Sequence, residues 1–166
     1  MFRSVRLPGS VKGKLYLHSM PGRYETFEEA AYEIVNLKID EIICLATPEE
    51  IRLKSPRYAD VLKFDKNIWR QRMFPIPNFG VPPDKQAFFQ LAAELAKELI
   101  SGKKLLIHCG GGIGRSGTLA IGLLIALGIR AEKARESVSS ALSYPETTVQ
   151  ERLLDWMAHM VEQKNF

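Results

Sequence analysis

A cysteine and an arginine with five residues between them are the most chemically informative pair in this sequence. Cys109 ends an apolar run, a glycine-rich stretch follows it, and Arg115 and Ser116 come next. Sulfur attacks phosphorus as a thiolate, and a helix N-terminus or a nearby cation favours that form. The planar guanidinium of an arginine binds two phosphate oxygens at once, which a lysine cannot do. The spacing therefore predicts a phosphate-binding cradle that contains its own nucleophile.

The residues between the cysteine and the arginine are expected to form the floor of this cradle. Glycines allow the backbone to adopt unusual dihedral angles and to turn its N–H groups inward. Such amides, together with the N-terminus of a helix expected to begin near Gly117, bind a phosphate dianion. Ser116 is expected to donate a hydrogen bond to the sulfur and help it leave, and His108 to orient the loop. The expected phosphate-binding residues are His108, Gly110, Gly111, Gly112, Ile113, Gly114 and Arg115.

The segments on either side of this stretch predict how the cradle is positioned. Strand-like apolar runs alternate with helical patterns, which is typical of an α/β domain with a largely parallel sheet. Such folds bind ligands at the carboxyl ends of their strands, where Cys109 lies. We expect a single domain over residues 1–166 whose mostly parallel central sheet is flanked by helices. The expected elements are strands at 14–18, 41–46 and 103–109, an extended piece at 73–77, helices at 26–37, from 47, within 56–68, from 84 to Ser101, at 118–127, 131–142 and 149–162, and a basic segment with a turn at 2–13.

The stretch from His108 to Ser116 has the pattern His-Cys-x5-Arg-Ser and resembles the phosphate-binding loop of the cysteine-dependent protein tyrosine and dual-specificity phosphatases. The resemblance implies a protein tyrosine phosphatase-like fold and hydrolysis of phosphotyrosine, with phosphoserine and phosphothreonine as further substrates, through a phosphocysteine intermediate. It implies no metal ion or cofactor. Relatives that act on highly charged inositol phosphates often carry lysines in this loop, whereas the residues here are uncharged. A buried structural cysteine or a plain anion site are the alternative interpretations.

A second segment resembles the mobile acid loop of the same family, but with one departure. Residues 77–82 have the sequence Pro-Asn-Phe-Gly-Val-Pro, and Asn78 occupies the position at which the family carries an aspartate. Hydrolysis of an ester needs a proton for the leaving oxygen, and an amide does not supply one at neutral pH. Asp84 or Asp65 is a possible substitute acid, although Asp84 also suits a helix start. Otherwise the protein acts on substrates with good leaving groups, or turns substrate over poorly.

Two further residues are candidates through the resemblance. Gln150 lies where the family carries a glutamine that positions the water for hydrolysis of the phosphocysteine, and a glutamine on a helix surface is the alternative. Arg23 follows the first predicted strand, in a segment that resembles the loop lining the substrate entrance of small relatives. Arg23 is therefore a candidate for contact with a phosphorylated or acidic substrate.

Composition limits the partners and the location of the protein. The 166 residues carry a net charge of +4 with a pI near 9.1, and the chain has two cysteines, Cys44 and Cys109. Two cysteines form no disulfide framework, and a nucleophilic thiol needs a reducing compartment. We expect a cytoplasmic monomer whose partners are phosphorylated protein substrates, because neither a nucleic-acid-binding patch nor an apolar run long enough for a membrane is evident.

Other classes of protein remain open. A phosphoprotein-binding module with weak catalysis is the main alternative, because Asn78 removes the family's acid. An intact Cys109 and Ser116 argue against it, since a module that only binds phosphate needs neither. A rhodanese or an arsenate reductase would use a similar anion loop but would not explain residues 77–82.

Overall fold

The computed structural model describes residues 1–65 and 69–164, and within them it places one five-stranded sheet. The strand order is β1-β2-β5-β3-β4, with β1 antiparallel to β2 and the other neighbours parallel. The predicted α/β fold with a mostly parallel sheet is therefore confirmed. The strands are β1 (Arg3–Val5), β2 (Lys14–His18), β3 (Glu41–Cys44), β4 (Gln71–Met73) and β5 (Lys104–His108).

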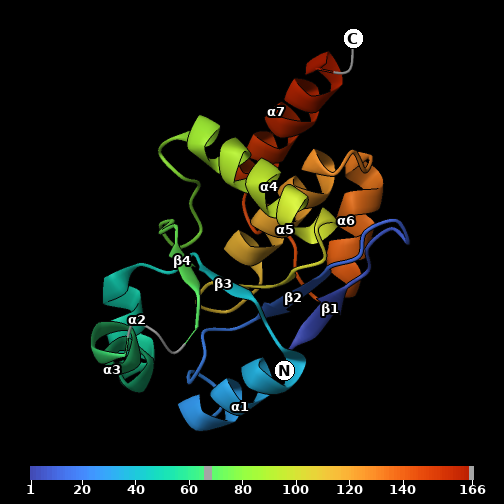
Figure 1. Cartoon of the computed structure of the whole chain (residues 1–166). Coiled ribbons are helices and arrows are strands. Elements are labelled where there is room, and N and C mark those ends of the chain that lie inside the picture. Colours follow the sequence, from blue (N-terminus) through green and yellow to red (C-terminus); the bar gives the residue numbers. More distant parts are fainter. Residues whose placement is uncertain (66–68, 165–166) are drawn as a thin grey trace.

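Helices cover both faces of the sheet, as Figure 1 shows. One face carries the helices of the first half of the chain, and the other carries the four later helices, with α5 in contact with α4, α6 and α7. The helices are α1 (Phe27–Leu37), α2 (Pro48–Lys54), α3 (Pro56–Phe64), α4 (Lys85–Ile100), α5 (Gly114–Ala126), α6 (Ala131–Ser140) and α7 (Thr148–Lys164).

Strand β5 lies in the centre of the sheet because both of its faces are apolar. Successive side chains of a strand point to opposite faces. Leu105 and Ile107 join the large core beneath α4, α5 and α7, whereas Leu106 packs in the smaller core with Ile34 of α1. Burial on both faces fixes the strand, and its carboxyl end delivers Cys109 to the edge of the sheet.

Helix α5 starts earlier than the sequence predicted. The helical pattern indicated a start near Gly117, but the helix begins at Gly114, and the Gly117 amide donates to the Ile113 carbonyl at 2.8 Å. The apolar pattern becomes visible only where side chains enter the core, which is after the first turn. Arg115 and Ser116 consequently lie on the first helical turn rather than in a loop.

Capping residues define the helix boundaries near the site. Thr26 accepts a hydrogen bond from the Glu29 amide while the Glu29 carboxylate accepts one from the Thr26 amide, and these two bonds form a capping box. Thr47 caps α2 through the Glu50 amide, and Asp84 caps α4 through the Ala87 amide. The cap at Thr47 matters most for the site, because it sets Glu50 in the first turn of α2.

Two strand expectations were wrong in detail. Residues 2–13 were expected to contain only a turn, yet Arg3–Val5 pairs with β2 as the antiparallel edge strand. The extended piece predicted at 73–77 is paired as a strand only at Gln71–Met73. Between this strand and Pro77, the chain makes two more hydrogen bonds, one to β3 and one to Leu45. Residues 66–68 of the predicted 56–68 segment lie outside the described residues.

Within the described ranges, no helix is long and apolar enough to cross a membrane.

Candidate active site

Cys109 lies in a tight loop between the end of β5 and the start of α5. Its thiol is almost fully buried, and the Gly112 amide donates a hydrogen bond to the sulfur at 3.2 Å. The Gly110 carbonyl accepts from the Met20 amide at 3.2 Å, outside the loop. The loop therefore directs an amide inward to the sulfur and a carbonyl outward, as the sequence predicted for a cradle.

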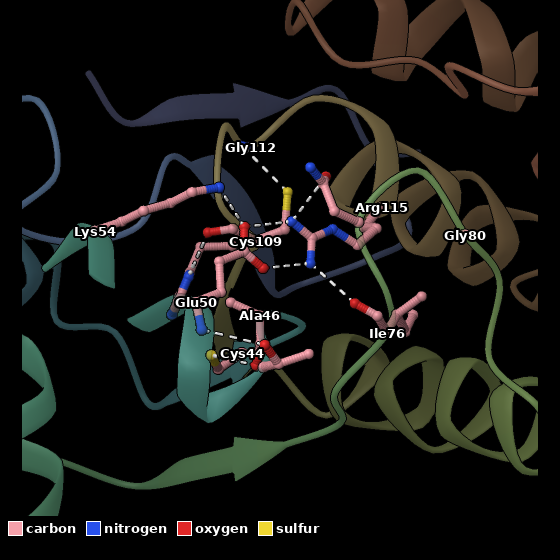
Figure 2. Close-up of polar contacts among 12 residues, drawn as sticks. Cys44, Ala46, Glu50, Lys54, Ile76, Gly80, Cys109, Gly112 and Arg115 are labelled. Carbon is pink, nitrogen blue, oxygen red and sulfur yellow. Dashed lines mark hydrogen bonds and ion pairs between the residues drawn. The ribbon is translucent and has the colours of Figure 1, made fainter. Parts of the chain in front are cut away.

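Arg115 crosses the loop and is held by a carboxylate. Its two terminal nitrogens each donate to Glu50 at 2.8 Å, and Nη1 also donates to the Ile76 carbonyl at 2.9 Å. Figure 2 shows the guanidinium between these two partners and beside Cys109. The Arg115 side chain is only 2% exposed, so its charge is fixed in position before any substrate binds.

Sequence reasoning did not identify Glu50 as part of the site. The signal available was Thr47-Pro48 at a helix start, which places Glu50 on the first turn of α2, but nothing in the sequence indicated that this turn faces the loop. Burial alone would raise the pKa of Glu50, but hydrogen bonds from Arg115 and from Lys54, at 2.7 Å, hold this pKa at about 2. Glu50 therefore stays ionised at neutral pH and orients Arg115 rather than donating a proton.

His108 orients the loop from the strand side. The Cys109 carbonyl can only accept, so Nδ1 of His108 carries the proton and donates to it at 3.1 Å. In the neutral ring Nε2 then accepts from the Tyr58 hydroxyl at 2.9 Å, and that hydroxyl accepts from Gln71 at 2.8 Å. Complete burial lowers the pKa of His108 to about 4, which keeps the ring neutral. His108, which was expected to orient the loop, thus has a fixed tautomer and connects the loop to Tyr58, a partner that the sequence did not indicate.

Ser116 is at the site but does not make the hydrogen bond predicted for it. Its hydroxyl is buried and has no hydrogen-bond partner among the residues that the structure describes. The sulfur of Cys109 instead accepts from the Gly112 amide. A buried hydroxyl without a partner is uncommon, and such groups often have a functional reason.

The acid loop is folded against the site with Asn78 turned inward. Its Oδ1 accepts from Arg115 Nη2 at 3.2 Å. The Thr147 hydroxyl donates to the Phe79 carbonyl at 3.2 Å, and the Gln150 side chain donates to the Gly80 carbonyl at 3.1 Å. Residues 77–80 are therefore tied to the start of α7, and Asn78 contacts Arg115 directly.

Gln150 is buried at the site, not exposed on a helix surface. Its amide oxygen accepts from the Glu146 amide at 2.7 Å, while its amide nitrogen is bonded to Gly80. Both ends of the side chain are thus occupied, and Gln150 connects the acid loop to the segment before α7. Asp84, the possible substitute acid, is exposed and caps α4. Asp65 follows the last residue of α3, whose end it caps.

Glu146 and Arg23 flank the loop at its two ends. A β-carbon on Gly114 would collide with the Glu146 carboxylate, so this exposed carboxylate lies against the backbone one residue before Arg115. A β-carbon on Gly110 would come within 3.2 Å of a terminal nitrogen of Arg23 and of Arg115. Arg23, a candidate for contact with substrate, therefore lies beside the loop. Glu146 is a residue that the sequence analysis did not identify.

The second cysteine differs chemically from the first. Burial raises the pKa of the Cys44 thiol to about 12, and its sulfur donates weakly to the Ala46 carbonyl at 3.8 Å. Cys44 is therefore a protonated core residue, as the sequence indicated. In residues 1–65 and 69–164, no group of three or more His, Cys, Asp or Glu side chains is arranged to hold a metal ion.

Comparison with known proteins places this geometry in a family. Residues 10–163 match the family model described as Swiss Army Knife protein, DSP-PTPase phosphatase domain. No curated protein matches the chain. Kinase associated phosphatase, in a form with its catalytic-site cysteine substituted by serine, has a similar structure with a TM-score of 0.80, 22% identity, and coverage of 98% of this chain and 94% of that chain.

Two other solved structures are also similar. Tk-PTP in its active form has a TM-score of 0.68 and 25% identity over 92% of this chain and 99% of that chain. A human tyrosine phosphatase-like serine/threonine/tyrosine-interacting protein has a TM-score of 0.69 and 20% identity over 96% of this chain and 97% of that chain. On the match over residues 10–163, the chain belongs to the DSP-PTPase phosphatase family.

Proposed function

We propose that the protein hydrolyses phosphotyrosine, and with it phosphoserine or phosphothreonine in proteins, through a phosphocysteine on Cys109. The observation that carries this proposal is the placement of Arg115, whose guanidinium is held by Glu50 across the loop that contains the sulfur. A buried cation fixed beside a nucleophile provides charge stabilisation without reorganisation during the reaction.

The first step transfers the phosphoryl group to sulfur. The Cys109 thiolate attacks phosphorus, the bond from phosphorus to the ester oxygen breaks, and the leaving oxygen takes up a proton. Charge on the equatorial oxygens is met by the loop amides, the N-terminus of α5 and Arg115, whose Nε–H is the N–H not used by Glu50, Ile76 or Asn78. The loop therefore supplies both the nucleophile and the stabilisation of the transition state.

The second step regenerates the free thiolate of Cys109. Water attacks the phosphocysteine, the phosphorus–sulfur bond breaks, and inorganic phosphate and the thiolate are released. The buried Ser116 hydroxyl, which has no partner among the described residues, is available to donate to the departing sulfur. Gln150 would orient this water only after giving up its hydrogen bond to Gly80 or to Glu146.

The first step also needs a group that protonates the leaving oxygen, and we assign Glu146 as the first candidate for this general acid. Asn78 has no proton to give, Glu50 is ionised, and Asp84 caps a helix. The Glu146 carboxylate is exposed and lies next to Gly114 of the loop. The amide of Asn78 retains its N–H groups for the leaving oxygen, because its oxygen is already bonded to Arg115.

The surroundings of the loop favour a phosphorylated protein. Phe79 is 56% exposed and Tyr24 is 68% exposed, and both belong to the segments that flank the cradle. Aromatic side chains of this kind stack well on a phenyl ring. Arg23, whose guanidinium lies 4.6 Å from the centre of the Tyr24 ring, supplies positive charge for acidic residues of a substrate. A reducing, cytoplasmic environment and a monomeric state complete the proposal.

The decisive experiment compares the wild-type protein with Cys109→Ser and Cys44→Ser on a phosphotyrosine peptide. The wild-type protein and Cys44→Ser should release phosphate and form an acid-stable phosphoprotein under rapid quench. Cys109→Ser should do neither, yet still bind the oxyanion tungstate. Phosphate release that survives Cys109→Ser would overturn the proposed function.

A phosphoprotein-binding module is the second candidate, and Asn78 is the observation that favours it. The human tyrosine phosphatase-like interacting protein is a structural neighbour whose name describes interaction rather than hydrolysis. Under this alternative the wild-type protein would bind a phosphotyrosine peptide as tightly as Cys109→Ser does and release no phosphate over many hours.

A further inference from the structure

We infer that Arg3 and Ser143 are positioning residues that hold the Gly112 carbonyl away from the cradle and thereby turn the next amide into it. The inference rests on the proposed function, because it concerns the same loop. Arg3 Nη2 donates to the Gly112 carbonyl at 2.7 Å, and the Ser143 hydroxyl donates to the same oxygen at 2.7 Å. One carbonyl of the catalytic loop is thus bound by two side chains from distant parts of the chain.

The peptide geometry connects this contact to anion binding. In a planar trans peptide, the C=O and the following N–H point in opposite directions. With the Gly112 carbonyl fixed outward, the Ile113 amide faces the interior of the loop. The Gly112 amide itself donates to the Cys109 sulfur at 3.2 Å. Two successive amides therefore point into the cradle, and Arg3 binds the outward carbonyl that lies between them.

The loop needs an external anchor because its own residues do not fix this peptide. Gly112 has a φ of +72°, and a β-carbon there would collide with the His18 carbonyl, so the position requires glycine. Gly111 before it and Gly114 two residues after it give the backbone access to other conformations. A rotated peptide would aim a carbonyl oxygen at the bound anion, and this would oppose binding.

Arg3 is itself fixed by the segment between α6 and α7. Its Nη1 donates to the Ala141 and Leu142 carbonyls at 2.9 Å and to the Ser143 hydroxyl at 3.1 Å. Strand β1, which carries Arg3, lies at the sheet edge beside α6 (Figure 1). The guanidinium therefore joins three parts of the fold, namely the edge strand, the turn after α6 and the catalytic loop.

The charge of Arg3 also acts on the site. Burial lowers the pKa of Arg3, and the nearby Cys109 opposes this effect. An arginine remains protonated in proteins, so a cation is retained behind the loop. The Arg3 guanidinium approaches the loop at Gly112, whereas the Glu50 carboxylate approaches it at Gly110.

The test measures oxyanion binding separately from turnover and from folding. Arg3→Met should raise the Kd for tungstate, measured by calorimetry, by about tenfold or more, because a hydrogen bond to a charged donor is lost. The binding stoichiometry should stay near one site per chain, and kcat on an aryl phosphate should fall in parallel. Arg6→Met, which removes the same charge from an exposed position nearby, should leave the Kd unchanged.

A second variant keeps the inference testable if Arg3→Met does not fold. Ser143→Ala removes the other donor to the Gly112 carbonyl and should raise the tungstate Kd about threefold to tenfold. Ser140→Ala is its control, because the Ser140 hydroxyl donates only to the exposed Glu136 carbonyl on α6.

The outcomes separate this inference from the proposed function. A purely structural role of Arg3 would lower the melting temperature or the stoichiometry but leave the Kd within twofold, and that result would overturn the inference. A weaker tungstate Kd in Arg3→Met, in a protein that releases no phosphate from any substrate, would instead support the anchor and overturn the proposed function.

Discussion

Glu50 and Arg115 meet through two hydrogen bonds of 2.8 Å although 65 positions separate them in the chain. The pair is nearly buried, with side chains 10% and 2% exposed. Burying both charges costs solvation free energy that offsets much of their attraction, so such a pair adds little net stability, whereas removing one partner leaves an uncompensated charge. The pair fixes the position of the Arg115 guanidinium beside the loop that contains Cys109.

Arg115→Lys is predicted to lower kcat/KM on an aryl phosphate by about 10²–10³-fold, because an ammonium does not replace the bidentate fork. Steady-state kinetics on p-nitrophenyl phosphate provide the measurement. Arg52→Lys is the matched control, since Arg52 pairs with Glu49 on the exposed surface of α2. A loss smaller than fivefold in Arg115→Lys would contradict the role assigned to the fork.

Glu50→Gln is predicted to change the acid stability of the protein. Burial tends to raise the pKa of Glu50, but Arg115 and Lys54 lower it from 4.5 to about 2. Between these two values the unfolded chain binds a proton that the folded protein does not, so the stabilisation is complete above pH 4.5 and is lost as the pH falls toward 2. The side chain is mostly buried, so solvent screens this effect little.

Chemical denaturation at several pH values tests this prediction. The difference in free energy of unfolding between the wild-type protein and Glu50→Gln should shrink as the pH is lowered from 4.5 to 2. Glu162→Gln is the control, because Glu162 is exposed on α7 and its variant should follow the wild-type curve. Parallel curves for the wild-type protein and Glu50→Gln would refute the linkage.

Asn78→Asp and Glu146→Gln together are predicted to identify the general acid. If Glu146 donates the proton, Glu146→Gln should lower turnover of a phosphotyrosine peptide by about 10²-fold and affect p-nitrophenyl phosphate far less, because its leaving group needs no proton. Asn78→Asp should then restore peptide turnover in the Glu146→Gln background. A wild-type rate in Glu146→Gln would exclude Glu146.

Much of the fold followed from local patterns. The capped helix starts at Thr26, Thr47 and Asp84 were visible because capping depends on a few neighbouring residues. The central strand was visible because it is apolar on both faces. Strand β1 was missed because an edge strand of three residues has too short a pattern, and its pairing with β2 depends on residues far along the chain.

The candidate site was predictable where it is contiguous and not where it is assembled by the fold. The residues from His108 to Ser116 are adjacent in sequence, so their spacing alone indicated a cradle. Glu50, Tyr58 and Arg3 reach the loop from separate elements, and no local signal marks a carboxylate or a hydroxyl that folding will place there. Asn78 was interpretable only because the loop around it resembles a known one.

Tyr58→Phe is predicted to destabilise the protein and disturb the loop through His108. The Tyr58 hydroxyl bonds Nε2 of the fully buried His108, and its removal leaves that nitrogen without a partner and takes away one of the two acceptors of Gln71 Nε2. A buried polar group left unpaired costs about 1–3 kcal/mol. Because the pKa of His108 is near 4, the ring does not escape this cost by protonation at neutral pH. The free energy of unfolding at pH 7 is the measurement, and Tyr32→Phe, an exposed hydroxyl on α1, should change it by less than about 0.5 kcal/mol. Equal stability of the Tyr58→Phe and Tyr32→Phe variants would contradict this prediction. It would show that the hydrogen-bond chain from Gln71 through Tyr58 and His108 to the Cys109 carbonyl does not stabilise the protein.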